Sequence, residues 1–166
     1  MSIFSRISIV HLALFNVLAT ALALLGALIS QYGFGLHPCH LCILQRIPYA
    51  IIIALGLILL VARHRKPLVK LLFASIVLLL LAETGIAIYH VGVEQGIVEG
   101  TSACGAAGAG NAQSLEDLRA AIMNSPLVSC NDVSFALFGI SMAGYNALFA
   151  LGLLAVNIGA WRRIND

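Results

Sequence analysis

The chain contains four cysteines, and two of them form the closely spaced pair Cys39-His40-Leu41-Cys42. A disulfide between these two would enclose only two residues, so it would add little stability through chain entropy. This pair is therefore better suited to redox exchange than to stapling the fold. The other two, Cys104 and Cys130, would close a substantial loop. Four cysteines allow three connectivities, and the residues alone leave all three open.

Arg46 follows Cys42 by four residues, near the start of an apolar run. If this run is a helix, Cys42 lies in its first turn, where unpaired N–H groups and the helix dipole favour a thiolate, with Arg46 over the same face. The thiolate is the reactive form of cysteine. An arginine at a membrane boundary is costly unless it is paired or reaches the interface, so we predict a functional role for Arg46, with plain snorkelling as the alternative.

The composition indicates a membrane protein. Of the 166 residues, 61% are hydrophobic and 10% are charged, and the mean hydropathy is +1.01. Such a chain lacks the polar surface that a water-soluble enzyme of this size needs. The net charge of +2 argues against nucleic-acid binding, which requires a clustered basic face.

Four apolar runs are long enough to cross about 30 Å of hydrocarbon. They cover approximately residues 7–29, 43–62, 68–89 and 138–161. The sequence therefore predicts an all-α membrane protein, a four-transmembrane-helix bundle in which residues 1–166 form a single integral membrane domain. A cleavable signal peptide is the alternative for the first run, but this run exceeds the usual apolar length of about 7 to 15 residues.

Most basic residues lie on one side of these spans. The positive-inside rule makes that side the cytoplasm, so both termini are predicted inside and the loops 30–41 and 90–135 outside. All four cysteines then lie on the outer side, where disulfides persist. In the second loop, residues 114–117 resemble a helix N-terminus and predict a short amphipathic helix, lying on the membrane surface or packed on the loop. The seven basic residues are Arg6, Arg63, Arg65, Lys66, Lys70, Arg162 and Arg163, out of nine.

A lipid-soluble quinone is the electron acceptor that best suits this site. The chain has no dinucleotide-binding motif, and Ile43 after Cys42 excludes a c-type haem attachment. A quinone needs only a pocket between helices and a cationic or polar group beside its oxygen, which Arg46 supplies. His90 is a candidate second polar group or proton carrier, although a lone interfacial histidine can be inert.

Glu83 lies inside the third apolar run, at a depth comparable to that of Arg46. An ionisable residue within a span is by default a functional hypothesis. We predict that Glu83 pairs with Arg46 or is protonated near the quinone. The alternative is a carboxyl group that is protonated in place or hydrogen-bonded to its own helix.

An ordered set of motifs resembles the DsbB family of quinone-linked disulfide oxidases. The resemblance extends over nearly the whole chain, with the four spans in the family's order. Two positions, Phe135 and Tyr145, depart from it, because tryptophan is expected there. The motifs are Pro38-Cys39-His40-Leu41-Cys42-Ile43-Leu44-Gln45-Arg46, Tyr89-His90-Val91-Gly92-Val93-Glu94, the pair Cys104 and Cys130, and Phe138-Gly139-Ile140-Ser141-Met142-Ala143.

The resemblance implies an inner-membrane protein of bacteria whose redox loops face the periplasm. Such a protein reoxidises a periplasmic thioredoxin-fold oxidase of the DsbA kind and passes electrons to ubiquinone or menaquinone. By this resemblance, Cys42 contacts the quinone beside Arg46, and His90 is linked to the quinone site. The resemblance also makes all four cysteines catalytic: Cys39 and Cys42 face the quinone, and Cys104 and Cys130 exchange with the partner, through a mixed disulfide at Cys104.

Three alternatives remain. A vitamin K epoxide reductase-like enzyme also links two cysteine pairs to a quinone, but its quinone-proximal pair comes late in the chain, the reverse of the order here. A structural zinc site could use the four cysteines or His37, His40 and His90, but the 25 residues between Cys104 and Cys130 provide no second knuckle. A non-catalytic membrane scaffold with disulfide staples would leave the placement of Arg46 unexplained.

Overall fold

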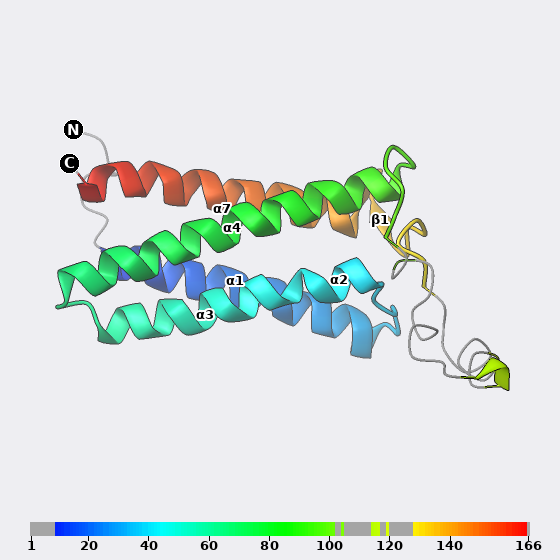
Figure 1. Cartoon of the computed structure of the whole chain (residues 1–166), viewed down its shortest axis with the longest axis horizontal. Helices are drawn as coiled ribbons and strands as arrows, with labels where there is room; N and C mark the ends of the chain where they lie inside the picture. The colour runs from blue at the N-terminus through cyan, green and yellow to red at the C-terminus, as the bar shows by residue number, and fades with distance from the viewer. Residues whose placement is uncertain (1–8, 102–103, 105–113, 117–118, 120–127, 166) are drawn as a thin grey trace.

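The computed structural model describes residues 9–101, 104, 114–116, 119 and 128–165. Within these residues the fold is a bundle of long helices, four of them long and apolar enough to cross a membrane (Figure 1). This confirms the predicted four-helix membrane fold. The elements are α1 (Ile9–Gly33), α2 (His40–Leu44), α3 (Arg46–Val61), α4 (Lys66–Glu94), the short strands β1 (Ala136–Leu137) and β2 (Ile140–Ser141), and α7 (Met142–Asn165). The second span consists of α2 and α3 together.

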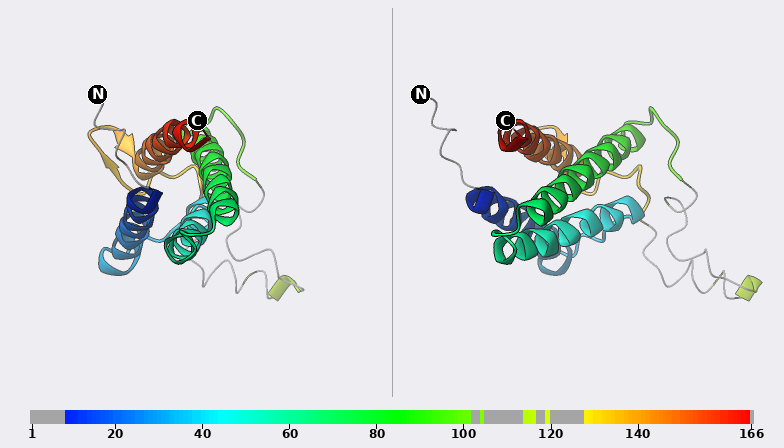
Figure 2. Two further views of the ribbon diagram at one scale, coloured as in Figure 1. Left: turned by 90° about the vertical axis from the view of Figure 1, so that its left-hand side faces the viewer. Right: turned by 60° about the vertical axis from the view of Figure 1, so that its left-hand side comes forward.

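The spans form a ring in which α1 packs against α3, α3 against α4, and α4 against α7. Seen along the bundle, α7 returns to the side of α1 and closes the ring (Figure 2). There Asn16 of α1 and Asn157 of α7 exchange two amide hydrogen bonds of 2.9 Å, and both side chains are fully buried. Amide groups in hydrocarbon bond across helices because lipid offers them no partner. This pair ties α1 to α7 in the half of the bundle away from the cysteines.

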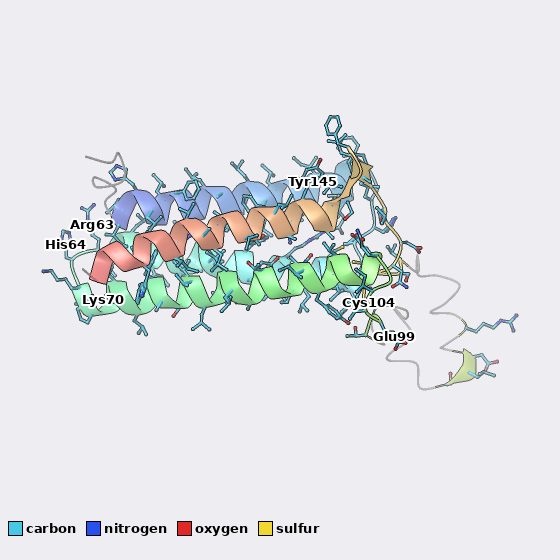
Figure 3. The ribbon with its side chains drawn as sticks, turned by 90° about the horizontal axis from the view of Figure 1, so that it is seen from above. Arg63, His64, Lys70, Glu99, Cys104 and Tyr145 are labelled. Carbon is cyan, nitrogen blue, oxygen red and sulfur yellow. A yellow bond between two sulfur atoms is a disulfide. The ribbon has the colours of Figure 1, made fainter. Side chains whose placement is uncertain are left out.

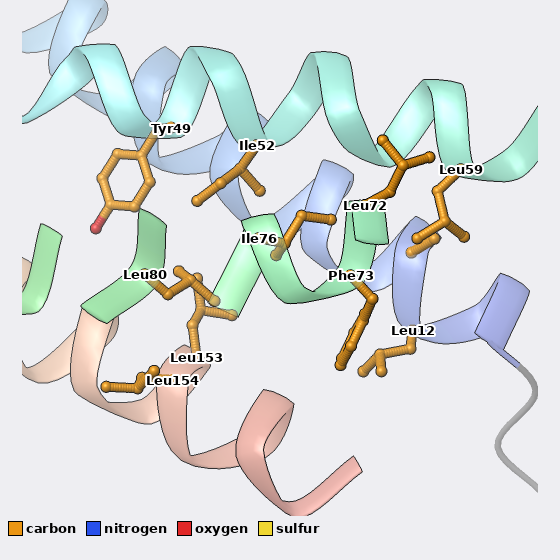
Figure 4. Packing of buried hydrophobic residues seen from close by; sticks show 11 residues of the cluster. Leu12, Tyr49, Ile52, Leu59, Leu72, Phe73, Ile76, Leu80, Leu153 and Leu154 are labelled. Carbon is orange, nitrogen blue, oxygen red and sulfur yellow. The ribbon is translucent and has the colours of Figure 1, made fainter. Parts of the chain in front are cut away.

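Buried apolar side chains fill the interior of the ring (Figure 4). The ring of Phe73, which belongs to this cluster, stacks on the ring of Trp161 with the two centroids 5.7 Å apart. Because lipid is as apolar as these side chains, close van der Waals packing holds the helices together. The central cluster comprises Leu12, Ala13, Tyr49, Ile52, Leu59, Leu72, Phe73, Ile76, Leu80, Leu153 and Leu154.

Replacing Gly56 by alanine is expected to destabilise the contact between α1 and α3. A Cβ atom at Gly56 would lie 2.5 Å from Cγ2 of Val17. Valine has one strongly preferred rotamer in a helix, so the helices must move apart, at a cost of about 1–3 kcal/mol. Thermal unfolding in detergent should show a lower Tm. Gly152→Ala is the matched control, because nothing lies within 4 Å of its added Cβ; an equal loss in both variants would contradict this account.

The helix boundaries correct the predicted spans. The first and third helices extend beyond residues 29 and 89, to Gly33 and Glu94, and the second span begins at His40 rather than at 43. The end of α4 is set by Gly96 at φ 68°, with N–H groups of Gly96 and Ile97 bonded back to the last helical turn. This is the Schellman arrangement, which glycine permits and which closes a helix.

The fourth span begins at Met142 rather than at 138, because residues 136–141 form a β-hairpin. Its turn residues Phe138 and Gly139 have φ angles of 50° and 80°, as a two-residue turn of type I′ requires. The hydroxyl of Tyr145 donates to the carbonyl oxygen of Leu137 at 3.0 Å and fixes the hairpin to the start of α7.

The two ends of the bundle differ in chemistry (Figure 3). Arg63, His64 and Lys70 lie at one end, whereas Cys104 and Tyr145 lie at the other. Arg6 lies outside the described residues, as does most of the predicted surface helix, residues 117–118 and 120–127.

Candidate functional site

Cys39 and Cys42 lie at the start of α2. Cys39 immediately precedes the helix in an extended conformation, and its Sγ accepts a hydrogen bond of 3.2 Å from the backbone N–H of Cys42. A side-chain acceptor at this position satisfies one of the unpaired N–H groups of the first turn. The two Sγ atoms lie 2.6 Å apart, so the pair can pass between dithiol and disulfide without rearrangement of the helix.

His90 reaches this pair from α4. Its Nε2 lies 3.5 Å from Sγ of Cys39, and its Nδ1 lies 3.4 Å from Oε1 of Gln45. Cys39 and His90 are 4% and 2% exposed. The structure therefore brings His90 to the cysteine pair, and the amide of Gln45 holds the imidazole from its other side. Gln45 was not among the predicted site residues.

The environment of Cys39 favours its thiolate. The side-chain hydrogen bond with Cys42 lowers the pKa of the Cys39 thiol, against the effect of burial, and His90 and the Cys42 N–H lower this pKa further. The hydrogen bond offered by the helix N-terminus goes to Cys39. It does not go to Cys42, for which the sequence predicted a thiolate.

The second span is interrupted between the cysteine pair and Arg46. Pro48 has no N–H to donate to the carbonyl of Leu44, and its ring crowds that carbonyl, so the regular helix is interrupted there. Gln45 accordingly separates α2 from α3 as a turn residue, although its backbone keeps helical angles.

Arg46 is the cation of the site. Its Nη1 donates a 2.6 Å hydrogen bond to Oε1 of Gln31 on α1. Its Nε is buried and has no hydrogen-bond partner among the described residues. A buried, unpaired guanidinium N–H is costly, so the hydrogen-bonding capacity of Arg46 is not fully used within the described residues.

A cavity of about 590 Å³ opens beside these residues, with walls from all four spans. Cys39, Cys42 and Arg46 line it together. Such a volume suits a small organic ring, and apolar walls with a few polar groups are typical of ligand pockets. The apolar lining includes Phe15, Ala19, Leu22, Ala23, Met142 and Phe149, and the polar lining includes Gln45, Tyr49, His90, Glu94 and Asn146.

Glu83 lies behind the cavity wall and is fully buried. Its Oε1 accepts a 2.9 Å hydrogen bond from Nδ2 of Asn146, whose Oδ1 accepts one of 2.7 Å from the hydroxyl of Tyr49. Among the residues that the structure describes, its Oε2 has no partner. The described partner of Glu83 is therefore Asn146 on α7, which contradicts the predicted pairing with Arg46, whereas the other prediction, a carboxyl group protonated near the quinone, stays a prediction. The chain of three polar groups connects α4, α7 and α3.

Cys104 and Cys130 are joined by a disulfide, with Cα atoms 5.1 Å apart, and both are buried. They pack in one cluster with Cys39, Leu41 and Val93. The structure thus brings the disulfide-bonded pair, Cys104 and Cys130, into contact with the free pair, Cys39 and Cys42. While this disulfide is closed, Cys104 and Cys130 cannot serve as zinc ligands.

Tyr49, Asn146, Gln31 and Gln45 complete the site, and the sequence interpretation missed them. Each is a polar residue within or beside an apolar run, which is itself a sign of function. Phe135 and Tyr145, the two departures from the tryptophans expected in the family, both line the cavity.

Comparison with known proteins gives a consistent result. The family model described as "Disulfide bond formation protein DsbB" matches residues 10–160. The "Uncharacterized protein RP370" of Rickettsia prowazekii is 30% identical over 150 residues, 90% of this chain and 84% of that protein. "Disulfide bond formation protein B" of Saccharophagus degradans is 31% identical over 149 residues, 81% of this chain and 82% of the relative. No solved structure matches the chain.

Proposed function

The chain belongs to the DsbB family of disulfide bond formation proteins, and we propose that it is a thiol:quinone oxidoreductase which reoxidises a periplasmic DsbA-like oxidase. Family membership makes it a membrane protein of disulfide bond formation. The observation that carries the finer proposal is the packing of both cysteine pairs in one cluster beside a cavity that Arg46 lines. The proposal places the single membrane domain in the bacterial inner membrane, with the cysteine end toward the periplasm.

The residues of the cavity fit a quinone ring. Its walls are mostly apolar, and Arg46 on the cavity wall supplies a charged donor for a carbonyl oxygen. A bound quinone, ubiquinone or menaquinone, would accept two electrons and two protons. In the protein, Cys42 and Arg46 would hold it, and His90 would take up a proton from the cysteine pair.

The relay runs through two exchanges. A thiolate of the partner attacks Sγ of Cys104, breaks the Cys104–Cys130 bond and forms a mixed disulfide; the partner's second thiol then resolves it and leaves Cys104 and Cys130 reduced. A thiolate of this reduced pair next attacks Sγ of Cys39 in the oxidised Cys39–Cys42 pair, with which it packs. Completion of that exchange closes Cys104–Cys130 again and leaves Cys39 and Cys42 as a dithiol. Each exchange moves two electrons and two protons toward the cavity.

The test is quinone reduction by the full-length protein in detergent, with a reduced thioredoxin-fold oxidase as donor and short-chain ubiquinone or menaquinone analogues as acceptors. We expect one quinone to be reduced for each partner disulfide formed. If the folded protein oxidises the partner without consuming quinone, the acceptor is wrong. If it oxidises no dithiol donor, the oxidase proposal fails.

Glu83 is proposed to be protonated and to serve the cavity through Asn146. Its described hydrogen-bond partner is a neutral amide, and a lone carboxylate is costly in the membrane interior. Glu83→Gln keeps an acceptor for Asn146 but cannot exchange a proton. We expect an unchanged Tm, because glutamine still accepts the hydrogen bond from Asn146, and slower quinone reduction. Equal rates of quinone reduction in the variant and the wild type would refute a proton-transfer role.

A further inference from the structure

Three potential metal ligands converge at the start of α2. Sγ of Cys39, Sγ of Cys42 and Nε2 of His90 all lie within 4.8 Å of one another. Two come from the N-terminus of α2 and one from α4, so the bundle itself assembles the set. Thiolate and imidazole are the ligands that Zn²⁺ prefers, and two cysteines with one histidine leave the fourth tetrahedral position open.

The spacing between sulfur and nitrogen suits a tetrahedral ion. Ligand bonds of ~2.3 Å to sulfur and ~2.0 Å to nitrogen place two such ligand atoms ~3.5 Å apart, and Sγ of Cys39 lies 3.5 Å from Nε2 of His90. Two thiolate ligands must stand ~3.8 Å apart, wider than the 2.6 Å between the cysteine sulfurs. Cys42 can supply this movement, because its partly exposed side chain borders the cavity.

The histidine is already oriented as a metal ligand. Its Nδ1 faces Oε1 of Gln45 at 3.4 Å, and a carbonyl oxygen there selects the tautomer that carries its proton on Nδ1. The lone pair of Nε2 then points at the cysteine pair. Metal-binding histidines are typically held in this way by an acceptor on the second nitrogen.

We propose that the reduced Cys39–Cys42 pair and His90 form a binding site for one thiophilic divalent cation, with Zn²⁺ as the fitting ion. Binding forms two metal–sulfur bonds, releases the proton of each cysteine that is still a thiol and changes no oxidation state. The disulfide form has no thiolates to offer, so the site exists only in the reduced protein. Inhibition of quinone reduction by Zn²⁺ would follow, and this consequence alone rests on the proposed function.

The experiment titrates Co²⁺ into the full-length protein carrying Cys104→Ser and Cys130→Ser, so that Cys39 and Cys42 are its only cysteines. With the pair reduced by a phosphine, we expect one Co²⁺ per chain, with thiolate-to-cobalt charge-transfer absorption, and displacement by Zn²⁺. Oxidation of the pair should abolish the absorption and renewed reduction should restore it. Absence of the absorption from the folded, reduced protein, or equal binding to the oxidised protein, would overturn the proposal.

Variants assign the ligands. Gln45→Ala should weaken binding ~10–100-fold, as loss of a histidine-orienting group does, and His90→Ala should weaken it further. His40→Ala is the matched control, because His40 is exposed and adjoins Cys39 without belonging to the ligand group. A loss of affinity with His40→Ala and none with His90→Ala would overturn the assignment. Because metal binding is read without quinone or partner, it can fail while the oxidase proposal stands, and the reverse also holds.

Discussion

Replacing Cys42 by serine is expected to lower steady-state quinone reduction by ~10³-fold or more, since removal of a covalent redox group ends its chemistry. A dithiol gives up two electrons when its two sulfurs form a disulfide. The serine hydroxyl cannot form a disulfide with Cys39, so the variant cannot pass two electrons to the quinone in this way. Both Cys39 and Cys42 line the cavity with Arg46, but Cys39 is buried in the cluster of Cys104 and Cys130, whereas Cys42 is only partly buried against it. We therefore expect Cys42 to be the sulfur that passes electrons to the proposed acceptor.

The same variant should keep its first exchange. The Cys104–Cys130 disulfide does not depend on Cys42, so Cys42→Ser should oxidise about one equivalent of the reduced partner and then stop. Rapid-quench alkylation of partner thiols, with the native chain as reference, measures this burst. Continued turnover in the variant would mean that electrons reach the quinone directly from Cys104 or Cys130, and the proposed order of the relay would be wrong.

The four-helix fold could be predicted because its signal is local. An apolar run of sufficient length must form a helix in lipid, where every backbone N–H needs an internal partner. The predicted ends were less accurate, because the end of α4 depends on one turn at Gly96, and the start of α7 depends on the hairpin at residues 136–141. Phe138 at positive φ occupies a turn position where asparagine or glycine is usual, so residue type gave no sign of the hairpin.

Pairings between helices were beyond the sequence interpretation. The bonds from Asn16 to Asn157 and from Glu83 to Asn146 depend on the rotation of each helix about its axis, and weak amphipathicity in lipid leaves this rotation unspecified. Hence the sequence identified Glu83 as an ionisable residue within a span, but the partner it proposed, Arg46, differs from the observed partner, Asn146. Pro48 could have indicated the break before α3, but the second span was predicted as one uninterrupted run.

The cysteine pair illustrates the same limit at atomic scale. Its spacing predicted a reactive pair at a helix N-terminus, and the structure places it there. Which sulfur receives the N–H depends on where the helix begins, and its start at His40 makes Cys39 the acceptor. Cys42 does not receive this hydrogen bond, although both cysteines line the cavity.

Replacing Arg46 by methionine is the second large effect we expect. The change removes the cation and the unpaired Nε donor but retains much of the side-chain length. A donor aimed at developing negative charge contributes ~10²–10³-fold to rate, so kcat/KM for quinone should fall by that factor. Quinone titrations of the native and variant proteins under saturating reduced partner measure this ratio.

Two further variants separate the charge from its geometry. Arg46→Lys keeps the charge but loses the planar fork that reaches Gln31 and the cavity together, so it should lie between wild type and Arg46→Met. Arg63→Met removes an exposed cation at the opposite end of the bundle and should leave the quinone kinetics unchanged. The burst of partner oxidation should be normal in all three variants, because the Cys104–Cys130 disulfide precedes the quinone in the relay. If Arg46→Met lost that burst but kept its affinity for quinone, Arg46 would act on thiol exchange, and the cavity would not be the quinone site.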